Sequence, residues 1–140
     1  MNKEELKNRT KTFALSIIKL IDKVPNTVSG NVIAKQIVRS ATSVGANYRA
    51  ACRAKSNKDF LYKILIIEEE ADETCYWLEL LKESLMVNQE LLNPLLKESN
   101  ELTAIFTATG KTLHSNINSK KSEIKNHKSE IINHKSEIIK

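Results

Sequence analysis

Glycine and proline are scarce in this chain, with 3 glycines and 2 prolines among 140 residues. Average usage of the two together is about 12%. So few turn residues exclude a β-sandwich, a β-barrel and a disordered linker protein, and no glycine-rich phosphate loop can be written. The chain is long enough for one domain. We therefore expect an all-α protein.

Cysteine and long apolar runs are also lacking. Two cysteines are too few for a disulfide scaffold. No apolar run approaches the roughly 18 residues of a membrane span, and the first residues, MNKEELKNRTKTF, contain no apolar core of a secretory signal. We therefore expect a cytoplasmic protein with reduced thiols and no membrane partner.

Residues that could carry catalysis are missing from the expected places. A di-iron bundle needs Glu-x-x-His motifs, and the chain has none, since its histidines are His114, His127 and His134. Cys52 and Cys75 have no histidine predicted nearby to activate them, and a helical hairpin would hold them roughly 24 Å apart. We expect two small buried thiols, no metal, no cofactor and no enzymatic activity.

Apolar residues recur at helical spacing in four segments. We expect helices over about 3–24 and 28–54, a third that starts at Ser56, and, after a turn at Asn88, a fourth that ends near residue 119. They would be joined as an up-down-up-down antiparallel four-helix bundle. Ser56 and Asp59 resemble a capping box, and Pro94 fits a first helical turn. The expected core stripes are Leu6, Thr10, Phe13, Ile17, Leu20 and Val24; Ile33, Ile37, Val44 and Tyr48; Phe60, Ile64, Ile67, Ala71, Cys75 (or Thr74), Leu78, Leu81 and Leu85; and Leu92, Leu95, Leu102, Phe106, Thr109 and Leu113.

Residues 120–140 form a separate tail in this interpretation. They read KSEIKNH, KSEIINH, KSEIIK, a repeat of period seven that places Ile124, Ile131 and Ile138 at one heptad position. The partner position holds Lys120, His127 and His134, so half of a coiled-coil seam is missing. Both a frayed continuation of the last helix and a disordered tail fit this sequence. The tail also holds 6 Lys and 3 Glu, against 16 basic and 14 acidic residues in 1–119.

Several polar residues are assigned structural roles. Pairing across the second and third helices places Arg39 opposite Asp72 or Glu69, and Ser43 with Asn47 should form a polar patch beside the apolar stripe. The remaining acidic run could suggest a cation site, but Arg9 and Lys11 of the first helix would lie level with it and neutralise it. The run comprises Glu68, Glu69, Glu70, Asp72 and Glu73.

A basic cluster at the corner between the second and third helices is not neutralised in the same way. Its excess is about four positive charges, because one carboxylate, Asp59, stands against five cations. The residues are Arg49, Arg53, Lys55, Lys58 and Lys63. In one interpretation these cations are simply solvated, and the dipole of the second helix favours them at its C-terminal end. Binding of phosphates or of a protein partner is the other.

The central stretch resembles a known family. Residues 36–81, QIVRSATSVGANYRAACRAKSNKDFLYKILIIEEEADETCYWLELL, are similar to the four-helix-bundle proteins encoded in intervening sequences of bacterial 23S ribosomal RNA genes. The matching elements are Arg39, Ser40, Ser43, Val44 and Asn47 on one helix and the segment 70–81 on the next. Relatives usually carry a glutamate where this chain has Ala50 and Ala51, which leaves the neighbouring arginines less compensated. The heptad tail is not part of the family pattern.

The resemblance implies a homopentameric ring without known enzymatic activity. Similar bundles serve as accessory subunits of diversity-generating retroelements, which implies RNA and a reverse transcriptase as possible partners. We therefore hold two hypotheses. In the first, an oligomeric bundle binds RNA or DNA phosphates with low sequence specificity through its basic corner. In the second, the protein is a structural or protein-interaction ring with no nucleic-acid role.

Overall fold

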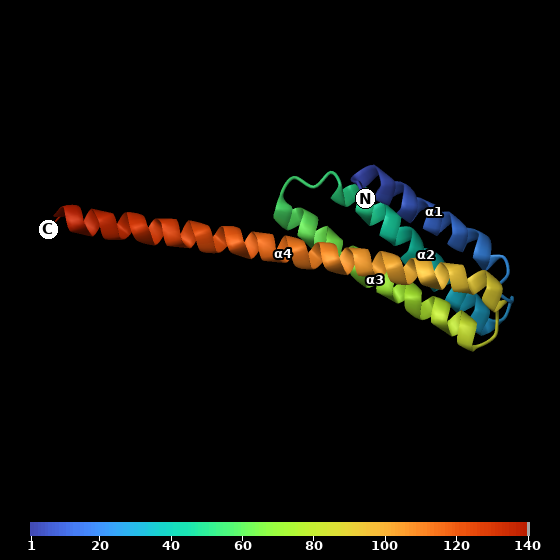
Figure 1. Cartoon of the computed structure of the whole chain (residues 1–140). Helices are drawn as coiled ribbons and strands as arrows, with labels where there is room; N and C mark the ends of the chain where they lie inside the picture. The colour runs from blue at the N-terminus through green and yellow to red at the C-terminus, as the bar shows by residue number, and fades with distance from the viewer. Residues whose placement is uncertain (140) are drawn as a thin grey trace.

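The chain folds into four helices joined by short connections (Figure 1). A computed structural model describes the backbone of residues 1–139 and the side chains of residues 1–132. Within them the helices are α1 (Lys3–Ile21), α2 (Val28–Ala51), α3 (Asn57–Glu83) and α4 (Gln89–Ile139), and no strand is present. The all-α class and the four-helix bundle expected from the sequence are confirmed.

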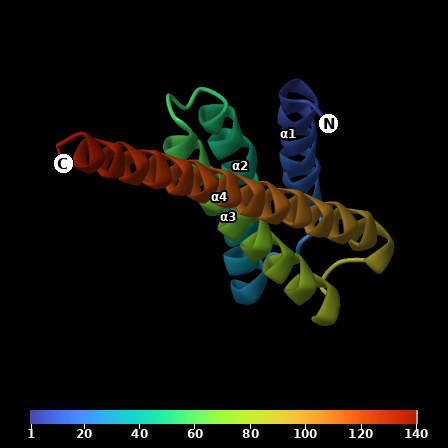
Figure 2. The same cartoon turned by 60° about the vertical axis from the view of Figure 1, so that its left-hand side comes forward.

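The helices contact one another in a closed circuit. Helix α1 packs on α2, α2 on α3, α3 on α4 and α4 back on α1. The diagonal pairs make no comparable contact. Figures 1 and 2 show the connection between α2 and α3 at the end of the bundle from which α4 projects. We call this the α2–α3 end, and the first turn of α1 lies there as well, because Lys3 Nζ stands 5.3 Å from the centre of the Phe60 ring.

The predicted apolar stripes form the core. Ile17, Ile37, Ile64 and Phe106 are fully buried at its centre, one from each helix. Leu85 is the exception in the predicted stripes, since it is 76% exposed. It has φ of 60° and follows the last turn of α3, where the Met86 N–H donates to the Leu81 carbonyl at 3.2 Å. Leu85 therefore ends the helix and adds nothing to the core.

The first residues of the helices were predicted more accurately from the sequence than the last residues. Thr27 and Ser56 cap the N-termini of α2 and α3, the latter by accepting a hydrogen bond from the Asp59 N–H at 3.1 Å. Helices α1 and α2 each end three residues earlier than predicted. Pro94 lies in the second turn of α4 rather than the first, because α4 already begins at Gln89. The proline cannot donate to the Glu90 carbonyl, which is on the exposed surface.

Helix α4 continues far beyond the bundle (Figure 1). Leu113 still packs against the core, and Asn57 of α3 lines one surface pocket with Lys120 and Glu123. Further along, the side chains are exposed to solvent up to residue 132. The division into a bundle of residues 1–119 and a tail stays a prediction. His134 and Ile138, which belong to the predicted heptad, lie outside the described side chains.

Candidate nucleic-acid interface

The basic cluster predicted from the sequence lies on the surface of the α2–α3 end. Arg49 is in the last turn of α2, Arg53 and Lys55 are in the connection, and Lys58 and Lys63 are in the first two turns of α3. Four of the five are exposed and Lys63 is partly buried. Within the described part of the chain, none of the five forms an ion pair. Their positive charge is therefore available to a ligand.

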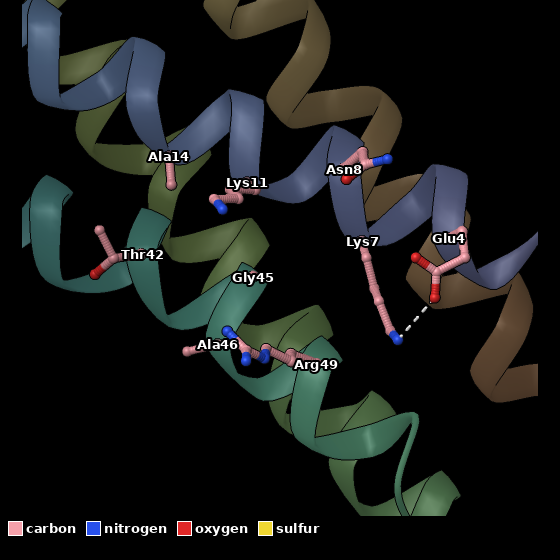
Figure 3. A pocket seen from close by; sticks show the side chains of 9 residues that line it. All are labelled: Glu4, Lys7, Asn8, Lys11, Ala14, Thr42, Gly45, Ala46 and Arg49. Carbon is pink, nitrogen blue, oxygen red and sulfur yellow. Dashed lines mark hydrogen bonds and ion pairs between the residues drawn. The ribbon is translucent and has the colours of Figure 1, made fainter.

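A groove between α1 and α2 extends this basic surface. It has a volume of about 340 Å³ and is lined by Lys7, Lys11, Thr42 and Arg49, among others (Figure 3). Lys7 is paired with Glu4 at 3.0 Å, whereas Lys11 and Arg49 have no carboxylate partner among the described residues. Arg49 thus belongs both to the corner and to the groove. Lys11 was predicted to neutralise the acidic run of the third helix, and the groove was not predicted from the sequence.

Small residues of α2 give the groove its floor. Gly45 faces α1, and a Cβ added to it would lie 3.5 Å from the carbonyl oxygen of Thr10. Gly45 and its neighbour Ala46 therefore let the two helices approach without side chains filling the space between them. Figure 3 shows Lys11 and Arg49 on opposite sides of this floor.

One exposed aromatic residue lies beside the basic cluster. Tyr62 is 66% exposed and follows Lys58 by one helical turn, so that both lie on the same face of α3. Exposed aromatic rings next to cations are the usual platforms on which nucleic-acid bases stack. No aromatic residue was predicted in the cluster, although the four-residue spacing between Lys58 and Tyr62 could have indicated this one.

Arg39 pairs with helix α3, but with different carboxylates than predicted. Its guanidinium contacts Glu70 at 3.1 Å and also Glu73, whereas Asp72 is exposed and Glu69 makes no ion pair within the described residues. The prediction of Asp72 or Glu69 was therefore wrong. The prediction matched positions across the two helices by counting residues along the chain, which ignores the rotation of each helix about its axis. In α3 this rotation turns Glu70 and Glu73, which are one turn apart, toward α2.

The hydrogen bond from Arg39 lowers the pKa of the Glu73 carboxyl, and the indole N–H of Trp77, which donates to the same carboxylate at 3.1 Å, acts in the same direction. Partial burial opposes both. This cluster joins α2 to α3 and has its charges satisfied internally. It is a structural feature, and because two carboxylates face its single cation it offers no free positive charge to a phosphate.

Arg9 also differs from expectation. It binds Glu98 of α4, with Nε 2.9 Å from Oε2, and Glu101 at 2.6 Å. The predicted pairing of the first helix with the acidic run fails because α1 and α3 are diagonal in the bundle and do not pack along their lengths. Glu68 instead accepts a hydrogen bond from Thr107 of α4 at 2.9 Å.

The remaining candidate residues are structural. The Asn47 side-chain amide donates to the Ser43 carbonyl at 2.9 Å and lies 2.8 Å from its hydroxyl, which confirms the polar patch beside the stripe. Cys52 and Cys75 are free thiols, but only Cys75 is buried as predicted, whereas Cys52 is partly exposed. Burial raises the pKa of the Tyr48 phenol, which packs on Phe106 with ring centres 5.6 Å apart.

Two kinds of site are absent from the described residues. They contain no group of three or more His, Cys, Asp or Glu side chains placed to hold a metal ion. None of their helices combines the length and the apolar character that crossing a membrane requires.

The fold and its basic end define a four-helix bundle with a cationic surface at one end. Residues 2–108 match the sequence model of the family described as 23S rRNA-intervening sequence protein, and the chain belongs to this family. A crystal structure of a protein with unknown function from the S23 ribosomal protein family of Bacteroides thetaiotaomicron is 37% identical, with a TM-score of 0.69. The match covers 75% of this chain and 97% of that one. No curated protein gives a match.

Proposed function

We propose that this protein is a non-enzymatic module that binds RNA, with low sequence specificity, at the α2–α3 end of the bundle. The observation that carries the proposal is the set of exposed cations on α2 and α3 that lack ion-pair partners in the described chain. Phosphate contacts from lysine and arginine supply most of non-specific nucleic-acid affinity.

The mode of contact follows from the residue types. Arg49, Arg53, Lys55 and Lys58 would bind the phosphate backbone, which carries no sequence information. Lys11 would add a contact from the groove. Tyr62 offers a ring on which an unpaired base of any identity can stack. Single-stranded or looped RNA is therefore the expected ligand.

The proposal includes a homo-oligomer, with the pentamer implied by the family resemblance as the expected form. Helix α3 carries apolar side chains beyond those of the bundle core, with Leu65 45% and Tyr76 53% exposed. Exposed apolar patches of this kind are typical of interfaces. A ring would repeat the basic end several times and raise the avidity for one RNA strand. Light scattering that gives a monomer mass at micromolar concentration would contradict this part.

The decisive experiment is charge reversal at the basic end. We expect Arg53→Glu with Lys58→Glu to abolish the binding of a generic single-stranded RNA, measured by fluorescence anisotropy at several salt concentrations. Both side chains are exposed, so the melting temperature and the oligomer mass should stay unchanged. The matched control is Lys23→Glu with Lys35→Glu, which changes the same charge at the opposite end of the bundle and should leave binding nearly intact.

Two results would overturn the proposal. Unchanged binding in the Arg53 and Lys58 variant would remove the basic end as the site and make the lysine-rich segment after residue 119 the better candidate. Dissociation of the oligomer in that variant would show that the cations hold neighbouring subunits together. The protein would then be a structural or protein-interaction ring, which is the alternative function.

A further inference from the structure

Beyond Glu123, the part of α4 that the structure describes is a helix without a partner. It projects away from the α2–α3 end, clear of the other three helices (Figure 1). Ile124 is 57% exposed and Ile131 is 42% exposed. These two isoleucines are seven residues apart, so they lie along one line of the helix surface.

The charged residues around this line follow the heptad as well. With Ile124 and Ile131 at position a, both g positions are glutamate and both e positions are lysine, while position d holds a histidine. The residues are Glu123 and Glu130 at g, Lys121 and Lys128 at e, and His127 at d. Positions e and g flank the seam of a coiled coil and set partner choice and orientation.

This arrangement distinguishes between the possible orientations of two identical helices. In a parallel pair, position g of one helix faces position e of the next heptad in the other helix, so that Glu123 would face Lys128 of a second copy. The symmetry of the pair gives the same contact twice. In an antiparallel pair, g faces g and e faces e, which brings glutamate against glutamate and lysine against lysine.

We propose that the α4 extension, residues 120–139, pairs in parallel and in register with the same segment of a second copy of this chain. Ile124 and Ile131 form the apolar contact, and Glu123 and Lys128 form ion pairs between the copies. The polar residue at d keeps the contact weak and reversible. The family match ends at residue 108, so this association is separate from the proposed RNA-binding end and from any ring formed by the bundle.

A cysteine placed in the seam of the full-length chain tests the proposal. In a parallel pair in register, the two residues at position 127 are neighbours, so His127→Cys should give an interchain disulfide under mild oxidation. Ser129→Cys places the thiol at position f, on the opposite side of the helix, and serves as the matched control. We expect several-fold more disulfide-linked dimer for position 127 on non-reducing gels, with the unaltered chain giving the background from Cys52 and Cys75.

Charge exchange in the His127→Cys chain tests the ion pairs across the seam. Glu123→Lys with Glu130→Lys makes the e and g positions between residues 121 and 130 all basic, and Lys121→Glu with Lys128→Glu makes them all acidic. Each variant alone should lose most of the dimer, and an equal mixture of the two should recover it as a heterodimer. Lys125→Glu, at position b, should have no effect.

Three results would overturn the inference. Equal crosslinking at positions 127 and 129 would show that no seam forms. A yield of disulfide-linked dimer that is unchanged in both charge variants would exclude the ion-paired register. Loss of the dimer without recovery in the mixture would show that opposite charges at positions e and g do not hold the two copies together, provided that circular dichroism shows the helix content of both variants to be unchanged.

Discussion

At the scale of single residues, Leu85 is the position where the backbone is strained. Its φ of 60° is the left-handed conformation that costs a residue with a Cβ roughly 1–2 kcal/mol, and its exposed side chain contributes little packing. We predict that Leu85→Gly raises the free energy of unfolding by about 1 kcal/mol, and the melting temperature by roughly 3–5 °C. Leu85→Ala keeps the strain and should not stabilise. Equal gains from both variants would assign the effect to the lost side chain.

Glu73 is the residue through which stability should depend on pH. Its pKa is lowered in the folded protein by Arg39, so its stabilising effect is present above the unfolded pKa near 4.5 and is lost as the pH falls through the folded value. We predict that Glu73→Gln destabilises at pH 7 by less than about 1 kcal/mol, because the pair is partly exposed. Near pH 3 the difference should shrink. Urea unfolding at the two pH values measures this, and a difference that is equal at both would contradict it.

At the scale of helices, the sequence predicts faces better than orientations. Apolar spacing identified the buried stripe of each helix because burial follows the helical period directly. The partners of Arg9 and Arg39 were predicted incorrectly because they depend on which helices are diagonal and on how each is rotated about its axis. Matching positions across a helical hairpin by counting residues along the chain takes account of neither the diagonal arrangement nor the rotation of each helix.

The extension of α4 should add little to the stability of the bundle. Its described side chains past residue 123 are exposed to solvent, and one apolar position per heptad buries too little area to offset the entropy of ordering about twenty residues. We predict that truncation after Ser119 lowers the melting temperature by no more than a few degrees. Calorimetry of the two chains at the same low concentration measures this. A larger fall would show that the extension packs against the bundle.

At the scale of the whole molecule, only part of the basic surface is visible in the sequence. The corner cluster could be predicted because its residues are close together along the chain and no carboxylate faces them across the hairpin. Lys11 could not be assigned to the same surface, since 38 positions separate it from Arg49 in the numbering and only the packing of α1 on α2 brings both to one groove. Gly45 lies on the floor of this groove, facing Thr10 of α1.

The groove and the corner cluster can be tested separately for their part in the RNA interface. If the groove belongs to it, each lysine bound to phosphate contributes about 0.7 to the slope of log affinity against log salt for a single strand. Lys11→Gln should therefore weaken binding and reduce that slope by about 0.7, because the substitution removes one phosphate contact and keeps a polar, unbranched side chain. Lys35→Gln removes the same charge at the far end and should leave the slope unchanged. A Lys11 variant with unaltered slope would confine the interface to the corner between α2 and α3, and a reduced slope in both variants would mean that the affinity follows net charge alone and not a defined surface.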